Sequence, residues 1–204
     1  GMLKPLALDA VVLDEGGRQP PLPAYLFLRG DLERPGTGEL VGLTPVAVGP
    51  EDALKHPTWR MGAKVTVDSA TMMNKGLETV EAHHLFGVPY DEIRVVVHRQ
   101  SVVHGGAVFE DGSAILHAAL PDMRLPISYG ILYPDRVDVG AKPVSFGATS
   151  WTFEEPRNDV FRCLPLAMGA GRAGGAYPVV LNAATELVVQ AFLDRRIQFM
   201  RIPD

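Results

Sequence analysis

Residues 93–120 read IRVVVHRQSVVHGGAVFEDGSAILHAAL, and this stretch decides the fold class. It contains three apolar runs rich in β-branched residues, at residues 93–98, 102–109 and 114–120, and these runs predict three strands. Between the last two runs stands Glu110-Asp111-Gly112-Ser113, which is typical of a hairpin turn. An earlier β-branched run, Lys64 to Val67, adds a fourth expected strand. The sequence therefore predicts a mostly antiparallel, four-stranded sheet.

Helical patterns lie on both sides of these strands. We expect one helix from Ser69 to Phe86, because short polar residues such as Asp68 and Ser69 favour helix starts. A short helix fits between Asp122 and Leu132. Residues 159–170 and 178–194 carry apolar residues at helical spacing and predict a helical hairpin. The predicted fold is α+β, with the sheet packed on helices and followed by a helical segment.

The chain divides into three predicted parts. Residues 1–50 are rich in Pro and Gly and form a divergent N-terminal region. Residues 51–145 hold the predicted strands and the polar segments, and they form the expected catalytic domain. Residues 146–204 are expected to be a linker and a truncated helical domain.

The composition is typical of a soluble globular protein. The chain has 204 residues, of which 47% are hydrophobic and 21% charged, and its formal net charge is -5. No Lys/Arg-rich block is present, so neither nucleic acid nor an anionic membrane is an expected partner. A single cysteine, Cys163, excludes an internal disulfide, and the apolar runs are too short to span a bilayer. These features predict a cytoplasmic protein.

The segment from Asp68 to Glu78, DSATMMNKGLE, carries most of the candidate chemistry. On a helix, Asn74 and Glu78 are four residues apart and Lys75 and Glu78 three apart, so their side chains converge. Ser69 at the expected helix start would add backbone N–H groups and the positive end of the helix dipole. Together these groups suit a phosphate that Lys75 neutralises, and Glu78 is left to reach a cation or a hydroxyl.

A structural interpretation of the same segment stays open at this point. In it, Ser69 is only an N-cap, Lys75 and Glu78 are a solvated surface pair, and Met72 and Met73 fill the core. Three other groups of residues have simple interpretations. Glu81 with His83 and His84 has a spacing that metal sites also use, although adjacent histidines point to different faces. His98 and His104 are expected to be hydrogen-bonded structural histidines, and Gly169, Gly171 and Gly174 mark a turn between helices.

Several longer motifs resemble one known family. They are HPTWRMG at residues 56–62, KVTVDSATMMNKGLE at 64–78, HRQSVVH at 98–104, DGS at 111–113, PDMRLPI at 121–127 and, more weakly, LNAATE at 181–186. This set resembles the 1-deoxy-D-xylulose 5-phosphate reductoisomerases of the non-mevalonate isoprenoid pathway. The resemblance extends over roughly residues 50 to 200.

The resemblance implies a set of site residues and cofactors. It assigns Glu78 and Lys75 as catalytic residues, with Glu78 the ligand to Mg or Mn. It places the substrate's phosphate and hydroxyls on the side chains of His56, Ser69, Asn74 and Lys75. Trp59 and Met61 would belong to a loop that closes over the substrate, while Ser101 and Met123 complete the substrate-binding residues. The implied reaction is a metal-assisted rearrangement of a sugar phosphate, followed by reduction with NADPH.

The sequence also departs from the family pattern. The family places an NADPH-binding domain ahead of this region, and we expect the chain by itself to lack this domain. Two of the family's three acidic metal ligands are not found, so metal binding through Glu78 alone is expected to be weak. Arg99 replaces a proline of the family's turn. The lone chain is therefore expected to be inactive or incomplete as an oxidoreductase.

Three functions remain open on these grounds. The chain is a sugar-phosphate-binding catalytic domain, or a non-catalytic relic that acts as a dimerisation or protein-interaction module, or one half of an enzyme whose NADPH domain another chain supplies. The family dimerises through this domain, so a homodimer is expected in each case.

Overall fold

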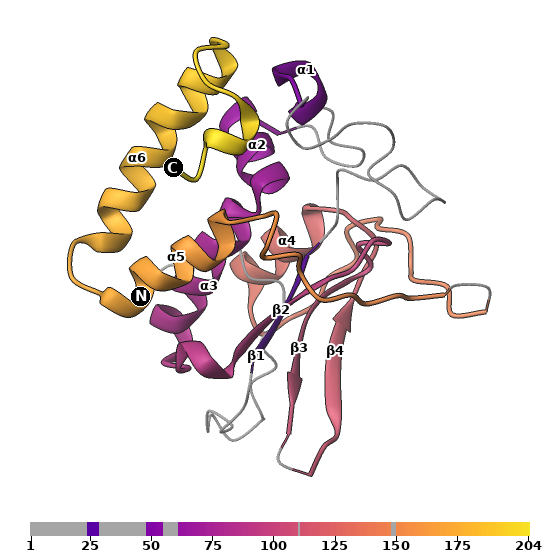
Figure 1. The fold of residues 1–204 in the computed structure, drawn as a ribbon. Coiled ribbons are helices and arrows are strands. Elements are labelled where there is room, and N and C mark those ends of the chain that lie inside the picture. The colour runs from indigo at the N-terminus through magenta and orange to yellow at the C-terminus, as the bar shows by residue number, and fades with distance from the viewer. Residues whose placement is uncertain (1–23, 29–47, 55–60, 110, 148–149) are drawn as a thin grey trace. The chain divides into compact units, whose positions relative to one another are not determined.

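The computed structural model describes residues 24–28, 48–54, 61–109, 111–147 and 150–204. These residues belong to two compact units that alternate along the chain. One unit contains residues 24–28 and 85–155 and includes the sheet, and the other contains residues 48–84 and 156–204 and is helical. Their helices and strands are labelled in Figure 1.

The sheet joins strands that are distant in the sequence. They are β1 (Ala24–Leu28), β2 (Ile93–Val97), β3 (Val103–Val108) and β4 (Ala114–Ala118). Their spatial order is β2-β1-β3-β4. β1 pairs in parallel with β2 and antiparallel with β3, and β3 pairs antiparallel with β4. The three strands expected within residues 93–120 are confirmed, whereas the sequence pattern does not predict β1.

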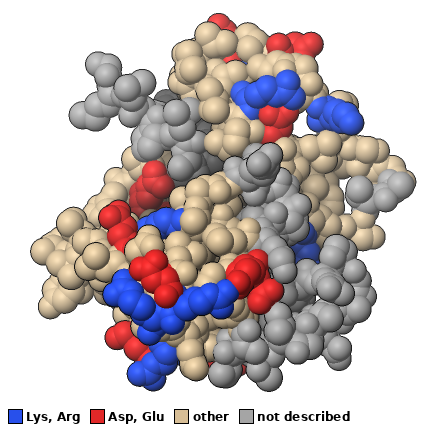
Figure 2. Space-filling view, turned by 90° about the horizontal axis from the view of Figure 1, so that it is seen from above, with Lys and Arg blue, Asp and Glu red and all other residues tan. Residues whose placement is uncertain are grey.

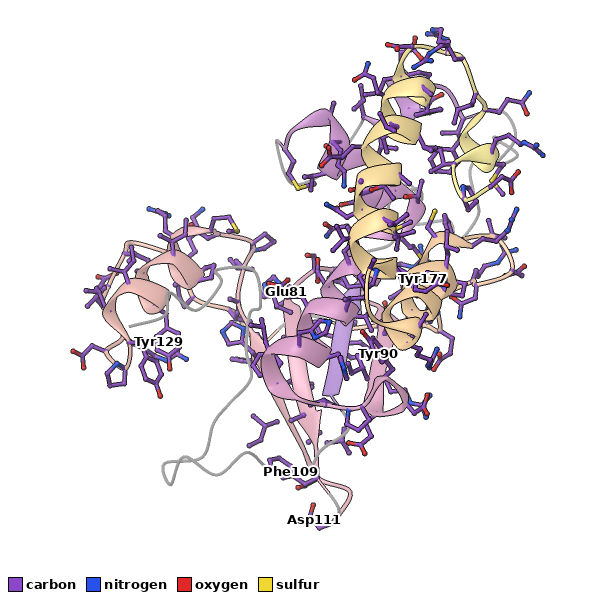
Figure 3. All side chains as sticks on the ribbon, turned by 90° about the vertical axis from the view of Figure 1, so that its left-hand side faces the viewer. Glu81, Tyr90, Phe109, Asp111, Tyr129 and Tyr177 are labelled. Atoms are coloured by element: carbon purple, nitrogen blue, oxygen red, sulfur yellow. The ribbon has the colours of Figure 1, made fainter. Side chains whose placement is uncertain are left out.

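A tight hairpin connects β3 and β4, as the sequence predicts. The Phe109 amide donates to the Ser113 carbonyl at 2.8 Å, and the Gly112 amide donates to the Phe109 carbonyl at 2.9 Å. Gly112 has a φ of 82°, a left-handed conformation that glycine adopts without strain. The Asp111 carboxylate accepts hydrogen bonds from the Ser113 amide and hydroxyl, at 2.8 and 2.6 Å. Figure 3 labels Phe109 and Asp111 at this tip of the hairpin.

A short segment around Glu154 pairs with β2. Val97 and Glu154 exchange two backbone hydrogen bonds, of 2.8 and 2.9 Å. Arg99, just after the strand, donates to both carboxylate oxygens of Glu154, at 2.6 and 2.7 Å. Since an open strand edge is a template for unwanted pairing, these contacts cover the C-terminal end of the β2 edge.

Helix α4 (Arg124–Leu132) also belongs to the sheet unit, where the sequence predicts a short helix. The Asp122 carboxylate accepts from the Arg124 amide at 3.0 Å and from the guanidinium at 2.5 Å. The same guanidinium donates to the Val139 carbonyl at 3.0 Å. Arg124 therefore fixes the loop after α4 to the start of that helix.

The second unit is built from helices that precede and follow residues 85–155 in the sequence. Its elements are α1 (Pro50–Ala53), α2 (Ala63–Thr71), most of α3 (Met73–Phe86), α5 (Cys163–Ala173), α6 (Tyr177–Leu193) and a 3-10 turn, Phe199–Arg201. Its core joins Val67 and Met73 to Ala167, Val189 and Phe192. Burying these apolar side chains together holds the two halves of the unit in one body.

The helical hairpin expected near the C-terminus is confirmed as α5 and α6. Gly169 and Gly171 lie within α5, and Gly174 ends it with a φ of 67° and an amide that donates to the Ala170 carbonyl. Gly169 and Gly171 are therefore helical, contrary to the prediction, and only Gly174 belongs to the predicted turn between α5 and α6.

The strand expected from Lys64 to Val67 is wrong, because these residues form the first half of α2. Thr66, Val67, Ala70 and Thr71 are buried, at a spacing that follows one face of a helix. Burial of this face outweighs the β-propensity of the Val and Thr residues. The mixed α and β character of the fold is nevertheless as predicted.

The surface carries charges of both signs. In the view of Figure 2, basic and acidic side chains lie next to one another. In the helical unit, Arg162 and Arg201 both pair with Asp204, at 2.8 and 3.1 Å, and Arg195 pairs with Glu51. Within the described part of the chain, no helix is both long and apolar enough to cross a membrane.

Candidate functional site

Met72 separates the two helices that carry the candidate site. It adopts a left-handed conformation with a φ of 65°, and its amide donates to the Ser69 carbonyl, so that α2 ends here. Asn74 and Lys75 therefore lie in the first turn of α3. Backbone N–H groups of a first turn have no intrahelical acceptor, and the helix dipole is positive there. The positive helix end expected at Ser69 is found instead at the start of α3.

Three side chains meet on the first turns of α3, and we call Asn74, Lys75 and Glu78 the α3 cluster. The Asn74 amide Nδ2 donates to Glu78 Oε1 at 2.6 Å, and the Lys75 ammonium donates to Glu78 Oε2 at 2.5 Å. Both carboxylate oxygens of Glu78 thus accept a hydrogen bond. The convergence expected from the three- and four-residue spacings is confirmed.

The α3 cluster is more buried than a solvated surface pair would be. The Lys75 side chain is 13% exposed and the Glu78 side chain 19% exposed. Water screens a pair in such a place less than it screens a surface pair. The expectation that Met72 and Met73 fill the core is confirmed, since they are 7% and 2% exposed.

Glu81 is a further acidic residue beside this cluster, and it follows Glu78 by three residues on α3 (Figure 3). Its pKa is raised above the ordinary value, first by burial and then by the negative charge of Glu78. The carboxylates of Glu78 and Glu81 therefore repel each other electrostatically on one face of α3. Sequence reasoning noted Glu81 only in connection with His84, although its spacing from Glu78 is the stronger signal.

Ser69 is not an N-cap, which contradicts both sequence interpretations of this residue. It lies in the last turn of α2, and its hydroxyl donates to the Val65 carbonyl at 2.9 Å. Serine hydroxyls inside helices commonly bond to the carbonyl one turn earlier. The Ser69 hydroxyl keeps its oxygen lone pairs, but its proton is engaged within α2.

Asp68 is a buried carboxylate that the sequence pattern does not reveal. It is 2% exposed, its Oδ2 pairs with the Lys64 ammonium at 2.5 Å, and its Oδ1 is buried without a hydrogen-bond partner among the described residues. Burial raises the pKa of Asp68, and the nearby charge of Glu186 adds to this, while Lys64 opposes it. The carboxyl group therefore lies in an environment that disfavours its charged form.

The remaining predicted site residues are dispersed between the units or lie outside the description. His56 and Trp59 fall outside the described residues. Met61, before α2, has 37% of its surface exposed. Ser101 and Met123 belong to the sheet unit, where Met123 precedes α4 and is 46% exposed.

Ser101 ends a tight turn that follows β2. It has a φ of 48°, which is uncommon for a residue other than glycine, and its amide donates to the His98 carbonyl at 3.2 Å. His98 is fully buried and stacks on Phe153, with 4.7 Å between the ring centroids. Its Nδ1 lies 2.9 Å from the Thr152 carbonyl oxygen and must donate to it.

Both turn histidines are hydrogen-bonded, as expected. His104 places Nε2 2.9 Å from the Ala119 carbonyl oxygen. Burial lowers the pKa of His98, and the nearby charge of His104 lowers it further, while the bond to Thr152 opposes this. His98 is therefore a neutral, structural histidine that supports the turn carrying Ser101.

The donor groups on α3 fit a hard divalent cation only in part. Carboxylate oxygens are the preferred protein ligands of Mg²⁺, and Glu78 offers two of them beside Glu81. Among the residues that the structure describes, no group of three or more His, Cys, Asp or Glu side chains is placed to hold a metal ion. That finding covers Glu81, His83 and His84, so it does not support a metal site there. A cation at Glu78 would need oxygens from a substrate or from water.

Two descriptions of known protein domains match parts of this chain. The C-terminal domain of 1-deoxy-D-xylulose 5-phosphate reductoisomerase matches residues 43–86, which include the α3 cluster. A second description of the DXP reductoisomerase C-terminal domain matches residues 118–204.

Curated relatives carry the same name. The 1-deoxy-D-xylulose 5-phosphate reductoisomerase of Clostridium botulinum strain Hall is 51% identical over 160 residues, which cover 78% of this chain and 42% of the relative. The 1-deoxy-D-xylulose 5-phosphate reductoisomerase 2 of Bacillus anthracis is 50% identical over 156 residues, which cover 76% and 41%. The chain thus spans about two fifths of the length of the curated relatives it matches.

Solved structures give the same result for the fold. A DOX-P reductoisomerase crystallised with NADPH, fosmidomycin and magnesium has a TM-score of 0.79 and 38% identity, covering 88% of this chain and 43% of that one. The Zymomonas mobilis enzyme in complex with NADPH has a TM-score of 0.77 and 38% identity, covering 88% and 45%. In sequence and in fold, the chain is therefore a relative of the C-terminal portion of the 1-deoxy-D-xylulose 5-phosphate reductoisomerases.

Proposed function

We propose that this chain binds the phosphate of 1-deoxy-D-xylulose 5-phosphate at the start of α3, as the catalytic part of a reductoisomerase. The α3 cluster carries this proposal, because it combines an ammonium and an amide with a helix N-terminus. Such an end attracts anions through its N–H groups and its dipole. The cluster lies inside the segment matched by the reductoisomerase domain.

Each residue of the cluster has a distinct proposed role. Lys75 neutralises the phosphate, Asn74 donates a hydrogen bond to it, and Glu78 contributes a carboxylate to a divalent cation. Ser69, His56, Ser101 and Met123 are proposed to complete the substrate site, and Trp59 and Met61 to shield it from water. A bound Mg or Mn would supply Lewis-acid chemistry, and NADPH would supply the hydride.

The solved relatives support these cofactors, because their names include NADPH and magnesium. The match to this chain covers less than half of each relative, so the whole reaction is proposed only for this chain combined with an NADPH-binding domain. Such a domain would belong to the same protein or to a partner. We further propose a cytoplasmic homodimer that binds neither nucleic acid nor a membrane.

Calorimetry tests the binding part of this proposal directly. We expect the purified chain to bind 1-deoxy-D-xylulose 5-phosphate and a phosphonate inhibitor of the family, more tightly with Mn than without it. Lys75→Ala should abolish this binding because the phosphate loses its counter-charge. Lys142→Ala removes an exposed lysine of the sheet unit and should leave binding unchanged. Equal absence of binding by the wild type and Lys75→Ala would refute the proposal.

A second function, as a dimerisation or protein-interaction module, is favoured by the exposed apolar side chains of α6. Tyr177, Val179, Val180 and Leu187 are each more than half exposed, at 63%, 71%, 63% and 74%. Contiguous exposed apolar surface commonly marks an interaction site. Sedimentation of the wild type and of Leu187→Glu tests whether α6 mediates self-association, and calorimetry with the sugar phosphate tests the first function. A dimer that Leu187→Glu dissociates, in a chain that binds no sugar phosphate, would leave only the second function.

A further inference from the structure

We propose that Lys75 gates the cation site, so that an anion bound at the start of α3 and a divalent cation bound at Glu78 increase each other's affinity. This inference rests on the proposed function, because it uses the same two ligands. It goes further because it names the cause of the coupling between the two ligands: Lys75 exchanges its partner Glu78 for the bound anion.

The hydrogen bonds of Glu78 show why the cation site is closed in the absence of an anion. One carboxylate oxygen accepts from Asn74 at 2.6 Å, and the other accepts from Lys75 at 2.5 Å. A cation at Glu78 would therefore lie close to the Lys75 ammonium, and the two positive charges would repel each other. Because Lys75 and Glu78 are both mostly buried, water weakens this repulsion only in part.

An anion at the start of α3 removes this obstacle. Lys75 and Asn74 lie in the first turn of α3, so an anion on the backbone N–H groups competes with Glu78 for their side-chain donors. When Lys75 turns to the anion, its charge is neutralised and both oxygens of Glu78 become available. Glu81 follows Glu78 by three residues on α3, so its carboxyl group lies on the same face and is available to the opened site. The same exchange increases anion affinity when a cation binds first, because linkage is reciprocal.

This mechanism predicts that one substitution changes the affinities for the anion and for the cation in opposite directions. Lys75→Met retains much of the side chain's bulk and removes its charge. Anion binding should fall, because the counter-charge is lost. Cation binding without an anion should become tighter, because the repulsion is also lost. A lysine that only stabilises the fold would lower both affinities.

The test is a titration with Mn²⁺ alone, in which electron paramagnetic resonance reports the free ion. In chloride buffer, Lys75→Met should bind Mn²⁺ about fivefold or more tightly than the wild type, the lower end of typical coupling. Lys142→Met, which removes an exposed charge of the sheet unit, should match the wild type. No gain in Lys75→Met over the wild type would overturn the proposal.

A second arm uses only the wild type and does not depend on how the variant folds. Replacing chloride by sulfate at equal ionic strength should tighten Mn²⁺ binding about fivefold or more, and Mn²⁺ should tighten sulfate binding by the same factor. In Lys75→Met the sulfate effect should be lost. Mn²⁺ affinity that is the same in both salts would overturn the coupling and leave the proposed function standing. Absence of Mn²⁺ binding in every sample would overturn the coupling together with the proposed cation site.

Discussion

The Gly76 backbone on α3 and the Ala167 side chain on α5 are in direct contact, since a Cβ placed on Gly76 would lie 2.4 Å from the Ala167 Cβ. The Cys163 carbonyl oxygen and the Leu164 Cα would lie 3.5 and 3.6 Å from the same position. The two helices can approach this closely only because residue 76 has no side chain. Gly76 directly follows Asn74 and Lys75, so this contact also anchors the candidate site.

Gly76→Ala should therefore destabilise the chain. Overpacking of this kind costs about 1 to 3 kcal/mol, and the higher helix propensity of alanine returns up to about 1 kcal/mol. We expect a net fall of about 1 to 2 kcal/mol in the free energy of unfolding in urea. Gly169→Ala is the matched control, because a Cβ at this glycine of α5 meets nothing within 4 Å. That substitution should raise stability by up to about 1 kcal/mol. Equal effects of the two substitutions would contradict the close contact.

Asp68 should make stability fall as pH rises above its ordinary pKa of 3.8. Because burial raises its pKa in the folded chain, the folded state holds this proton at pH values where the unfolded state has lost it. The contribution is complete below pH 3.8 and is lost as pH rises through the folded pKa. Asp68→Asn removes this titration. Urea unfolding from pH 4 to 7 should show a less negative slope in the variant, and an unchanged slope would exclude Asp68 as its source.

His98 should make the stability of the structure around it fall as pH falls, which is the opposite pH dependence to that of Asp68. Its pKa is lowered by burial, so the unfolded state binds the proton more readily. The stability it contributes is complete above its ordinary pKa of 6.5 and is lost as pH falls through the folded pKa. Hydrogen exchange of the Val97 and Glu154 amides should therefore become faster on acidification from neutral pH, after correction for the intrinsic rate. His98→Gln should weaken this dependence, and amides that stay equally protected in both proteins would rule it out.

The Arg99–Glu154 ion pair should contribute little to global stability despite its two short hydrogen bonds. The arginine side chain is 29% exposed and the glutamate 47% exposed, so water screens the pair. A double-mutant cycle with Arg99→Ala and Glu154→Ala should give a coupling energy of up to about 1 kcal/mol that decreases with salt. The more exposed pair Arg157 and Asp159, at 61% and 69%, should give a coupling near zero. A coupling well above that of a surface pair would indicate that the segment around Glu154 depends on this ion pair.

The sequence by itself determined the elements whose signals are local. Two apolar runs on either side of an Asp-Gly turn specify the β3–β4 hairpin, because strand propensity and turn residues act between neighbours in the chain. Helical periodicity likewise specifies α5 and α6. The convergence of Asn74, Lys75 and Glu78 follows from their spacing alone, since residues three and four apart on a helix meet.

Only the tertiary structure decided the rest. Val65, Thr66 and Val67 have β-branched side chains, yet they are helical because Val67 packs into a core that includes residues from much later in the chain, such as Val189. The position of β1 between β2 and β3, the burial of Asp68 and the contact of Gly76 with Ala167 likewise depend on partners distant in the sequence. The free energy of burying apolar side chains depends on contacts that form only in the assembled core. It can therefore outweigh the secondary-structure propensity of a segment wherever residues distant in the sequence pack against it.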